Sequence, residues 1–163
     1  MTDALAVRPL TKEAFAPFGE VLETEGADIR FINDGMCTRF HALARVETRG
    51  EGARVVVSLF RTEPAPLALQ LSMMERHPLG GQAFWPLSGG DWLVVVAPDE
   101  NGQPGTPLVF RANGHQGVCY APNIWHHPLL ALARVSDFLV VDRDGPGANL
   151  EEARYDTPYA VAA

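Results

Sequence analysis

The sequence has few cysteines and few basic residues, and both scarcities limit what the protein can be. Of 163 residues only two are cysteines, Cys37 and Cys119, and they form no paired motif. Two free thiols are typical of a reducing cytosol, and we expect both to be small buried side chains. The formal net charge is -7, which argues against nucleic acid and anionic membrane as partners because both need a basic face. A small anionic substrate remains possible, since a local arginine can bind it.

The sequence also lacks a long apolar run. Stretches such as "WLVVVAP" are too short to span a bilayer, and the N-terminal "MTDALAVRPLTKEAF" has no basic start followed by an apolar core. We therefore expect a cytoplasmic protein. No repeat recurs and no linker separates two cores, so we expect a single domain over residues 1–163.

What the sequence does contain is a series of short segments rich in Val, Leu and aromatic residues, separated by Gly and Pro. They predict an all-β sandwich or barrel. The expected strands are Ala4–Leu10, Glu20–Glu23, Arg54–Arg61, Leu67–His77, Gln82–Leu87, Trp92–Ala97, Leu108–Arg111, Gly117–Tyr120, Trp125–Leu132 and Phe138–Asp142.

Three further segments carry local signals. One short N-terminal helix is expected, capped by Thr11 and ended at Gly19. The segment Pro98–Pro107 contains Asn-Gly and other turn formers, which predict an exposed hairpin loop. The polar tail after Leu150 is expected on the surface.

A polar pattern interrupts the apolar strands in "ERHPLGGQAFWPLSG". Alternate residues of a strand face the same side, so Glu75 and His77 point together, and Gln82 can return to the same wall after the turn. The spacing Glu-x-His-x4-Gln-x6-Gly reproduces the first cupin motif, His-x-His-x4-Glu-x6-Gly. His77 and Gly89 match that motif, whereas Glu75 replaces its first histidine and Gln82 its glutamate.

A histidine pair follows about forty residues later, in "YAPNIWHHP". Asn123 can take the left-handed conformation that the turn before the pair requires. The second cupin motif ends in a histidine that follows a turn and faces the barrel interior. If this stretch is aligned with the motif on its Trp-His step, that histidine is His126. If the positions are counted from Pro122 instead, it is His127. Because neighbouring strand residues face opposite sides, we expect only one of them in the pocket and favour His126.

These groups are candidate metal ligands. Glu75, His77, Gln82 and His126 offer a mixed oxygen and nitrogen set that suits a divalent Ni, Mn, Fe or Zn ion. A metal-free polar cavity is the alternative, because glutamine is a poor ligand and only three good donors remain. No organic cofactor is expected.

With these motifs the sequence resembles the ureidoglycolate lyase family of allantoin (purine) catabolism. The resemblance lies most specifically in "ERHPLGGQAFWPL" and "GVCYAPNIWHHPL". It is supported by "PLTKEAFAPFGEVLE", "INDGMCTRFH", "SLFRTEP" and "VSDFLVVDR". It implies a cupin-like double-stranded β-helix (a jelly-roll barrel), a homodimer, and cleavage of ureidoglycolate to glyoxylate and urea. Asp34 departs from the family's usual "INNG", which concerns only that loop.

That reaction needs a base, an acid and a clamp for the substrate carboxylate. Glu75, His77 and His126 are the candidate catalytic residues, with His127 as the alternative to His126. An arginine suits the clamp because its planar fork matches two oxygens. Further candidate substrate-binding residues supply amide or hydroxyl groups. The full set of candidate substrate-binding residues is Arg61, which we favour as the clamp, and Arg39, Arg143, Gln82, Asn33 and Tyr120.

Other functions fit the same fold. An amidohydrolase could act on the same substrate and release ammonia, but the sequence shows no nucleophile–base pair or two-metal ligand array. A non-catalytic cupin that binds a small acid would be expected to carry a DNA-binding segment or partner surface, and no basic helical segment is present. A sugar isomerase cupin is a third alternative.

Overall fold

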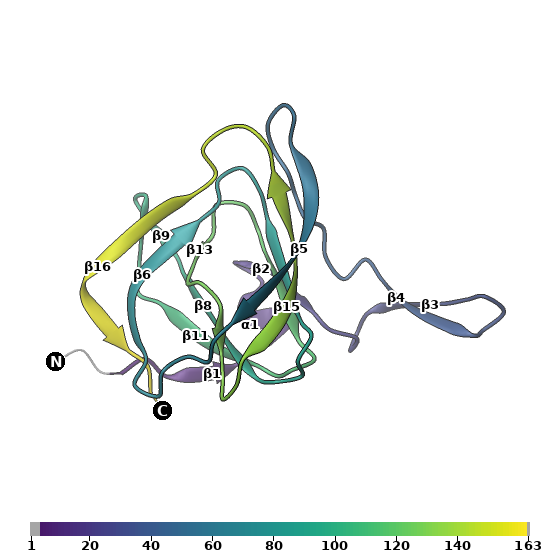
Figure 1. Ribbon diagram of the computed structural model, residues 1–163, viewed down its shortest axis with the longest axis horizontal. Helices are drawn as coiled ribbons and strands as arrows, with labels where there is room; N and C mark the ends of the chain where they lie inside the picture. Colours follow the sequence, from purple (N-terminus) through teal and green to yellow (C-terminus); the bar gives the residue numbers. More distant parts are fainter. Residues whose placement is uncertain (1–3, 163) are drawn as a thin grey trace.

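The computed structural model describes residues 4–162, which fold around two facing β-sheets (Figure 1). The first sheet has the order β1 (Val7–Pro9), β11 (Leu108–Ala112), β8 (Trp92–Ala97), β13 (Trp125–His126), β6 (Gln70–Arg76) and β16 (Glu151–Ala160), with β14 (Leu130–Ala131) also paired to β8. The second sheet has the order β2 (Gly19–Leu22), β12 (Gly117–Tyr120), β7 (Gln82–Pro86), β15 (Ser136–Asp144) and β5 (Arg54–Thr62). Two hairpins stand outside these sheets: β3 (Asp28–Ile32) with β4 (Cys37–His41), and β9 (Asp99–Glu100) with β10 (Gln103–Pro104).

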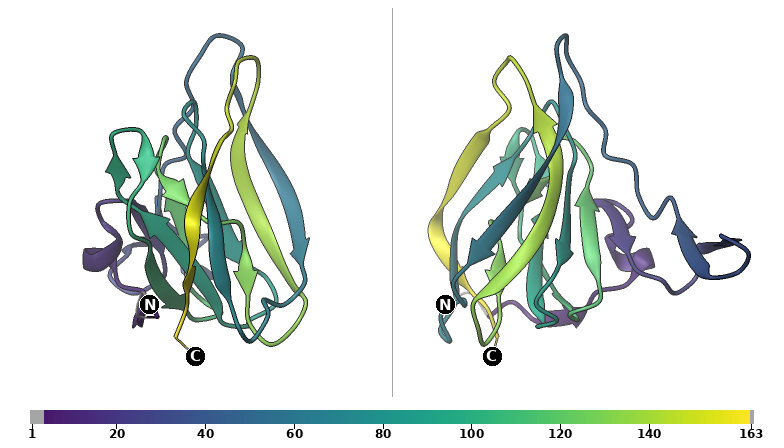
Figure 2. Two further views of the ribbon diagram at one scale, coloured as in Figure 1. Left: turned by 90° about the vertical axis from the view of Figure 1, so that its left-hand side faces the viewer. Right: turned by 45° about the vertical axis from the view of Figure 1, so that its right-hand side comes forward.

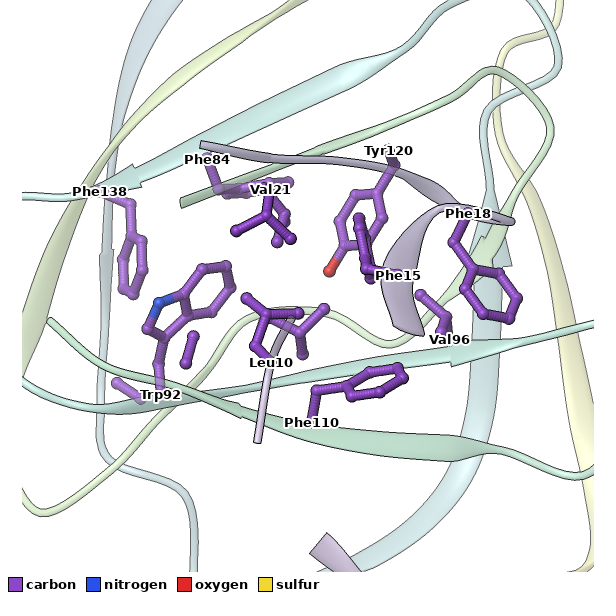
Figure 3. Packing of buried hydrophobic residues seen from close by; sticks show 14 of the residues in the cluster. Leu10, Phe15, Phe18, Val21, Phe84, Trp92, Val96, Phe110, Tyr120 and Phe138 are labelled. Carbon is purple, nitrogen blue, oxygen red and sulfur yellow. The ribbon is translucent and has the colours of Figure 1, made fainter. Parts of the chain in front are cut away.

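The sheets curl toward each other and enclose a shared apolar core (Figures 2 and 3). Strand alternation sends Trp92 and Phe110 of the first sheet, and Phe138 of the second, into this core, where all three are almost fully buried. The helix α1 (Lys12–Phe15) closes one side with Phe15, whose ring packs edge-on against that of Phe110. The all-β, cupin-like fold with a short N-terminal helix is therefore confirmed.

Several local predictions are also confirmed. The strands β8 and β12 have the bounds expected from the sequence, and Thr11 caps α1 by accepting a hydrogen bond from the backbone N–H of Ala14 at 3.2 Å. The expected strand Trp125–Leu132 is divided into β13 and β14. Pro128 lies in the break, and because proline has no N–H it cannot donate to a sheet.

Two strand-forming regions were missed. The tail after Leu150 is not merely surface chain but contains β16, a strand antiparallel to β6. In β16 the side chains of Ala153, Tyr155 and Tyr159 pack on a core cluster, so apolar and polar residues alternate as in a half-buried edge strand. The second missed element is the β3–β4 hairpin, which turns at Asn33 and Asp34, both at φ 54.

This hairpin extends away from the barrel (Figures 1 and 2). It carries Cys37, which is exposed, so the expectation of two buried cysteines was wrong for Cys37 and confirmed for Cys119. Burial raises the pKa of the Cys119 thiol to about 12. In residues 4–162 no helix is long and apolar enough to cross a membrane.

Candidate functional site

A cavity of about 320 Å³ opens between the two sheets. Apolar side chains and convergent polar groups form its wall, which is the usual make-up of a small-molecule site. It is lined by Phe60, Arg61, Thr62, Glu75, Gln82, Phe84, Tyr120, His126, His127, Pro128 and Leu129.

Glu75, His77 and His126 form a cluster at the edge of this cavity, which Glu75 and His126 line directly. Glu75 on β6 and His126 on β13 are direct partners in the antiparallel register, and His77 follows the end of β6. The Glu75 Oε1 lies 3.6 Å from His126 Nε2 and 3.9 Å from His77 Nε2. One potential ligand atom from each of the three residues lies within 4.8 Å of the others. The sequence spacing and the preference for His126 therefore correspond to a real cluster.

Backbone carbonyls orient both imidazoles. The Nδ1 of His77 lies 2.7 Å from the carbonyl oxygen of Asn149, and the Nδ1 of His126 lies 2.9 Å from that of Ile124. A carbonyl oxygen only accepts, so each Nδ1 carries the proton and, in the neutral ring, each Nε2 keeps its lone pair. Both Nε2 atoms are shielded from solvent and have no hydrogen-bond partner. Histidines that bind metals are oriented in this way.

The charges of the surrounding groups follow from burial and proximity. Burial raises the pKa of the Glu75 carboxyl, but the neighbouring His126, His77 and His127 outweigh it, so that the pKa is lowered overall and the group is ionised. Burial lowers the pKa of His127. Burial, together with Glu75, raises the pKa of Tyr120, which keeps its hydroxyl proton.

Tyr120 and Gln82 complete the wall of the cavity. The Tyr120 ring stacks flat on His126, with centroids 4.3 Å apart and planes 13° from parallel. The Gln82 Nε2 donates to Asp142 Oδ2 at 3.0 Å, while its Oε1 is buried with no hydrogen-bond partner. Because a carboxylate only accepts, Asp142 fixes which end of the Gln82 amide is left free. Sequence reasoning missed Asp142, although it faces Gln82 across adjacent strands.

His127 lies in a different place from that expected. Both His126 and His127 line the cavity, so the expectation that only one could do so was wrong. β13 ends at His126, and strict alternation does not continue into the irregular segment that follows it. Asn123 has φ 68, which confirms the expected left-handed conformation.

The three candidate arginines are placed very differently. Arg61 borders the cavity, but its Nε and Nη2 donate to Asp137 at 2.7 and 2.9 Å, and its side chain is 69% exposed. Arg143 is buried, and its guanidinium donates to the backbone oxygens of Arg49, Gly145 and Pro146. These hydrogen bonds use the Arg143 guanidinium to hold neighbouring loops together, so it is not free to bind a substrate carboxylate. Arg39 and Asn33 lie on the β3–β4 hairpin and do not line this cavity.

Comparison with known proteins adds a family to this geometry. The family model described as ureidoglycolate lyase matches residues 2–162. The chain belongs to the ureidoglycolate lyase family. It is 58% identical over 161 residues to a ureidoglycolate lyase of Rhizobium etli (strain CIAT 652), an alignment that covers 99% of this chain and 97% of the relative. It is 56% identical over 162 residues to the ureidoglycolate lyase of Agrobacterium fabrum (strain C58), covering 99% and 98%.

Among solved structures, a dTDP sugar isomerase from Desulfovibrio desulfuricans G20 aligns with a TM-score of 0.44 and 18% identity. That alignment covers 82% of this chain and 87% of the isomerase.

Proposed function

We propose that this protein is a ureidoglycolate lyase, which cleaves ureidoglycolate to glyoxylate and urea in the cytoplasm during allantoin degradation. Membership of the ureidoglycolate lyase family supports the substrate and the reaction. The observation that carries the proposal is the buried cluster of one ionised carboxylate and two imidazoles whose Nε2 atoms have no partner. It supplies proton-accepting groups inside a cavity sized for a small acid.

The substrate carries a hydroxyl, a carboxylate and a urea nitrogen on one carbon. Cleavage removes the hydroxyl proton, converts the C–O bond to a carbonyl, breaks the C–N bond and returns a proton to the departing nitrogen. The Nε2 of His126 or His77 can take the hydroxyl proton, because the carbonyl bonded to Nδ1 keeps that lone pair free. Glu75 then stabilises the imidazolium at 3.6 to 3.9 Å, and the same proton is available for urea.

The remaining groups hold the substrate. The free Oε1 of Gln82 can accept a hydrogen bond from a urea N–H, and the protonated Tyr120 hydroxyl can donate one. Arg61 is the clamp candidate that borders the cavity, and Asp137 leaves its Nη1 free to donate to the substrate carboxylate. We do not assign this role to Arg39, Asn33 or Arg143, because their positions separate them from the cavity wall.

The cluster also fits a divalent metal ion. Glu75, His77 and His126 would be its ligands, since their donor atoms converge and both imidazoles present a bare Nε2. The oxygen and nitrogen set suits Ni, Mn, Fe or Zn, with Gln82 Oε1 as a weaker fourth donor. A metal bound there would act as a Lewis acid that acidifies the substrate hydroxyl.

A matched pair of histidine variants tests the proposal. His126→Asn should lower kcat/KM for ureidoglycolate by about 100-fold or more, the usual contribution of a general base. His115→Asn should leave it unchanged, because His115 is exposed in a loop. Equal activity of the two variants would contradict the role of the cluster. Activity that survives complete metal removal would exclude the metal-assisted form.

A further inference from the structure

Each of the two motifs that build the cluster contains a residue with no part in the proposed chemistry. In "ERH" it is Arg76, which follows Glu75, and in "WHH" it is Trp125, which precedes His126. Neighbouring strand residues face opposite sides of a sheet, so Arg76 and Trp125 point away from the cavity that the other two residues line. The Arg76 guanidinium carbon lies 4.3 Å from the centre of the Trp125 ring, a cation–π contact. β6 and β13 are therefore joined on both faces of the sheet.

Asp99 connects these two side chains. Its Oδ1 accepts hydrogen bonds from Arg76 Nη1 at 2.8 Å and from Trp125 Nε1 at 2.9 Å. Its Oδ2 accepts from the backbone N–H of Gly102 at 3.0 Å, which fixes the carboxylate within the β9–β10 hairpin (Figure 1). The Nε of Arg76 also donates to Glu151 on β16 at 2.6 Å. One guanidinium thus joins β6 to β13, to the β9–β10 hairpin and to β16.

The burial of these groups makes the arrangement specific. The Arg76 side chain is 12% exposed, and Trp125 is buried. A charge removed from water destabilises the fold unless its donors are paired, so the guanidinium can take few positions. Its planar fork directs the Nε and Nη1 donors along fixed lines, which a flexible lysine does not do. The contacts of Arg76 therefore hold Trp125 and the β9–β10 hairpin in one place relative to β6.

The backbone links between β6 and β13 are short. In residues 4–162 the pairing of these strands consists of one register pair, Glu75 with His126, and the N–H of Asn123 adds a hydrogen bond to the carbonyl of His77 at 2.8 Å. That register pair sets the 3.6 Å distance from Glu75 Oε1 to His126 Nε2. The stabilisation of an imidazolium by a carboxylate falls as their distance grows. The side-chain contacts behind the sheet therefore bear directly on this distance.

We propose that Asp99 is a positioning residue: through the Arg76–Trp125 pair behind the sheet, it sets the distance between β6 and β13. This inference rests on the proposed function, because the two strands carry the carboxylate and the imidazole assigned to proton transfer. It also gives the hairpin within Pro98–Pro107 a role, although its sequence indicates only an exposed turn.

Steady-state kinetics of matched hairpin variants tests the proposal. Asp99→Ala should lower kcat for ureidoglycolate about 10- to 100-fold, the usual cost of a misplaced catalytic group. It should leave KM nearly unchanged, because Arg61 and Gln82 lie on the second sheet. Asp99→Asn should recover most of kcat, since its side-chain oxygen can still accept both hydrogen bonds. Glu100→Ala is the control, because Glu100 is exposed on the same hairpin and accepts neither of them.

A second variant checks that the three side chains act as one unit. Arg76→Lys keeps the positive charge but loses the planar fork, so kcat should fall as it does in Asp99→Ala. The double variant should then lose little more than the more damaged single variant, because residues that act together are not additive. Full additivity would show that Asp99 acts independently of Arg76 and would overturn the proposal.

A cross-strand NMR measurement separates positioning from stability. Nuclear Overhauser contacts between Glu75 and His126 should be strong in the wild-type protein and in Glu100→Ala, and weakened in Asp99→Ala. An Asp99→Ala protein that keeps these contacts, or keeps the kcat of the control, would overturn the proposal whether or not it loses thermal stability. A wild-type protein with no turnover of ureidoglycolate would contradict the proposed function instead, and the cross-strand contacts would still decide the role of Asp99.

Discussion

The fixed orientation of the Gln82 amide leads to a quantitative prediction. Asp142 accepts a hydrogen bond from Gln82 Nε2 at 3.0 Å, and this leaves Oε1 free in the cavity. Asp142→Ala removes the acceptor, so the amide can rotate and present its NH2 group instead. A hydrogen bond to a charged partner contributes about 1.5–3 kcal/mol. If all of it is used to hold the reactive orientation, kcat/KM for ureidoglycolate should fall about 10- to 150-fold.

Steady-state kinetics of matched variants checks this prediction. Asp144→Ala is the control, because Asp144 lies on the same strand but is exposed and pairs with Arg54 at the surface. Asp142→Asn should fall between the wild-type protein and Asp142→Ala, since an asparagine can still accept from Gln82 in one of its two orientations. If Asp142→Ala loses thermal stability but keeps the kcat/KM of the control, Asp142 is only structural and the reasoning is wrong.

Three further predictions concern the clamp, the carboxylate and the helix. Arg61→Ala should raise KM about tenfold, or ~1.4 kcal/mol, with little change in kcat; an unchanged KM would remove Arg61 as the clamp. The pKa of the Glu75 carboxyl is lower in the folded protein than in the unfolded chain. Its ionised form therefore stabilises the folded state at any pH above the pKa of the unfolded chain. This stabilisation is lost as the pH falls through the pKa of the folded state. In acid-unfolding titrations Glu75→Gln should therefore weaken this pH dependence, and identical curves would contradict the cluster's charge assignment. Thr11→Ala should cost about 1 kcal/mol in urea unfolding, because it removes the cap of α1; no change would mean that the cap is not needed.

The sequence was most informative where residue type and spacing act locally. The unbroken apolar run of β8 and the alternation from Glu75 to His77 need only strand geometry, and both were predicted correctly. β16 was missed because its polar side chains conceal the alternation, and because its partner β6 lies some eighty residues earlier in the chain. Pairing over such a distance leaves no local signal.

The same limit applies to the site. The preference for His126 followed from alternation, but alternation could not show that the regular strand ends there and that His127 lines the same cavity. Arg143 has the composition of a clamp, and only the fold shows that backbone carbonyls surround its guanidinium. Asp142 was overlooked because its role depends on facing Gln82 across two strands sixty residues apart.

Product stoichiometry tests the central claim most directly. Purified protein is mixed with racemic ureidoglycolate, and glyoxylate, urea and ammonia are followed together, with and without a strong chelator. The lyase reaction predicts glyoxylate and urea in equal amounts and no ammonia, with the chelator sample reporting whether Glu75, His77 and His126 hold a working metal. Ammonia in place of urea, or no turnover at all, would contradict the proposed function.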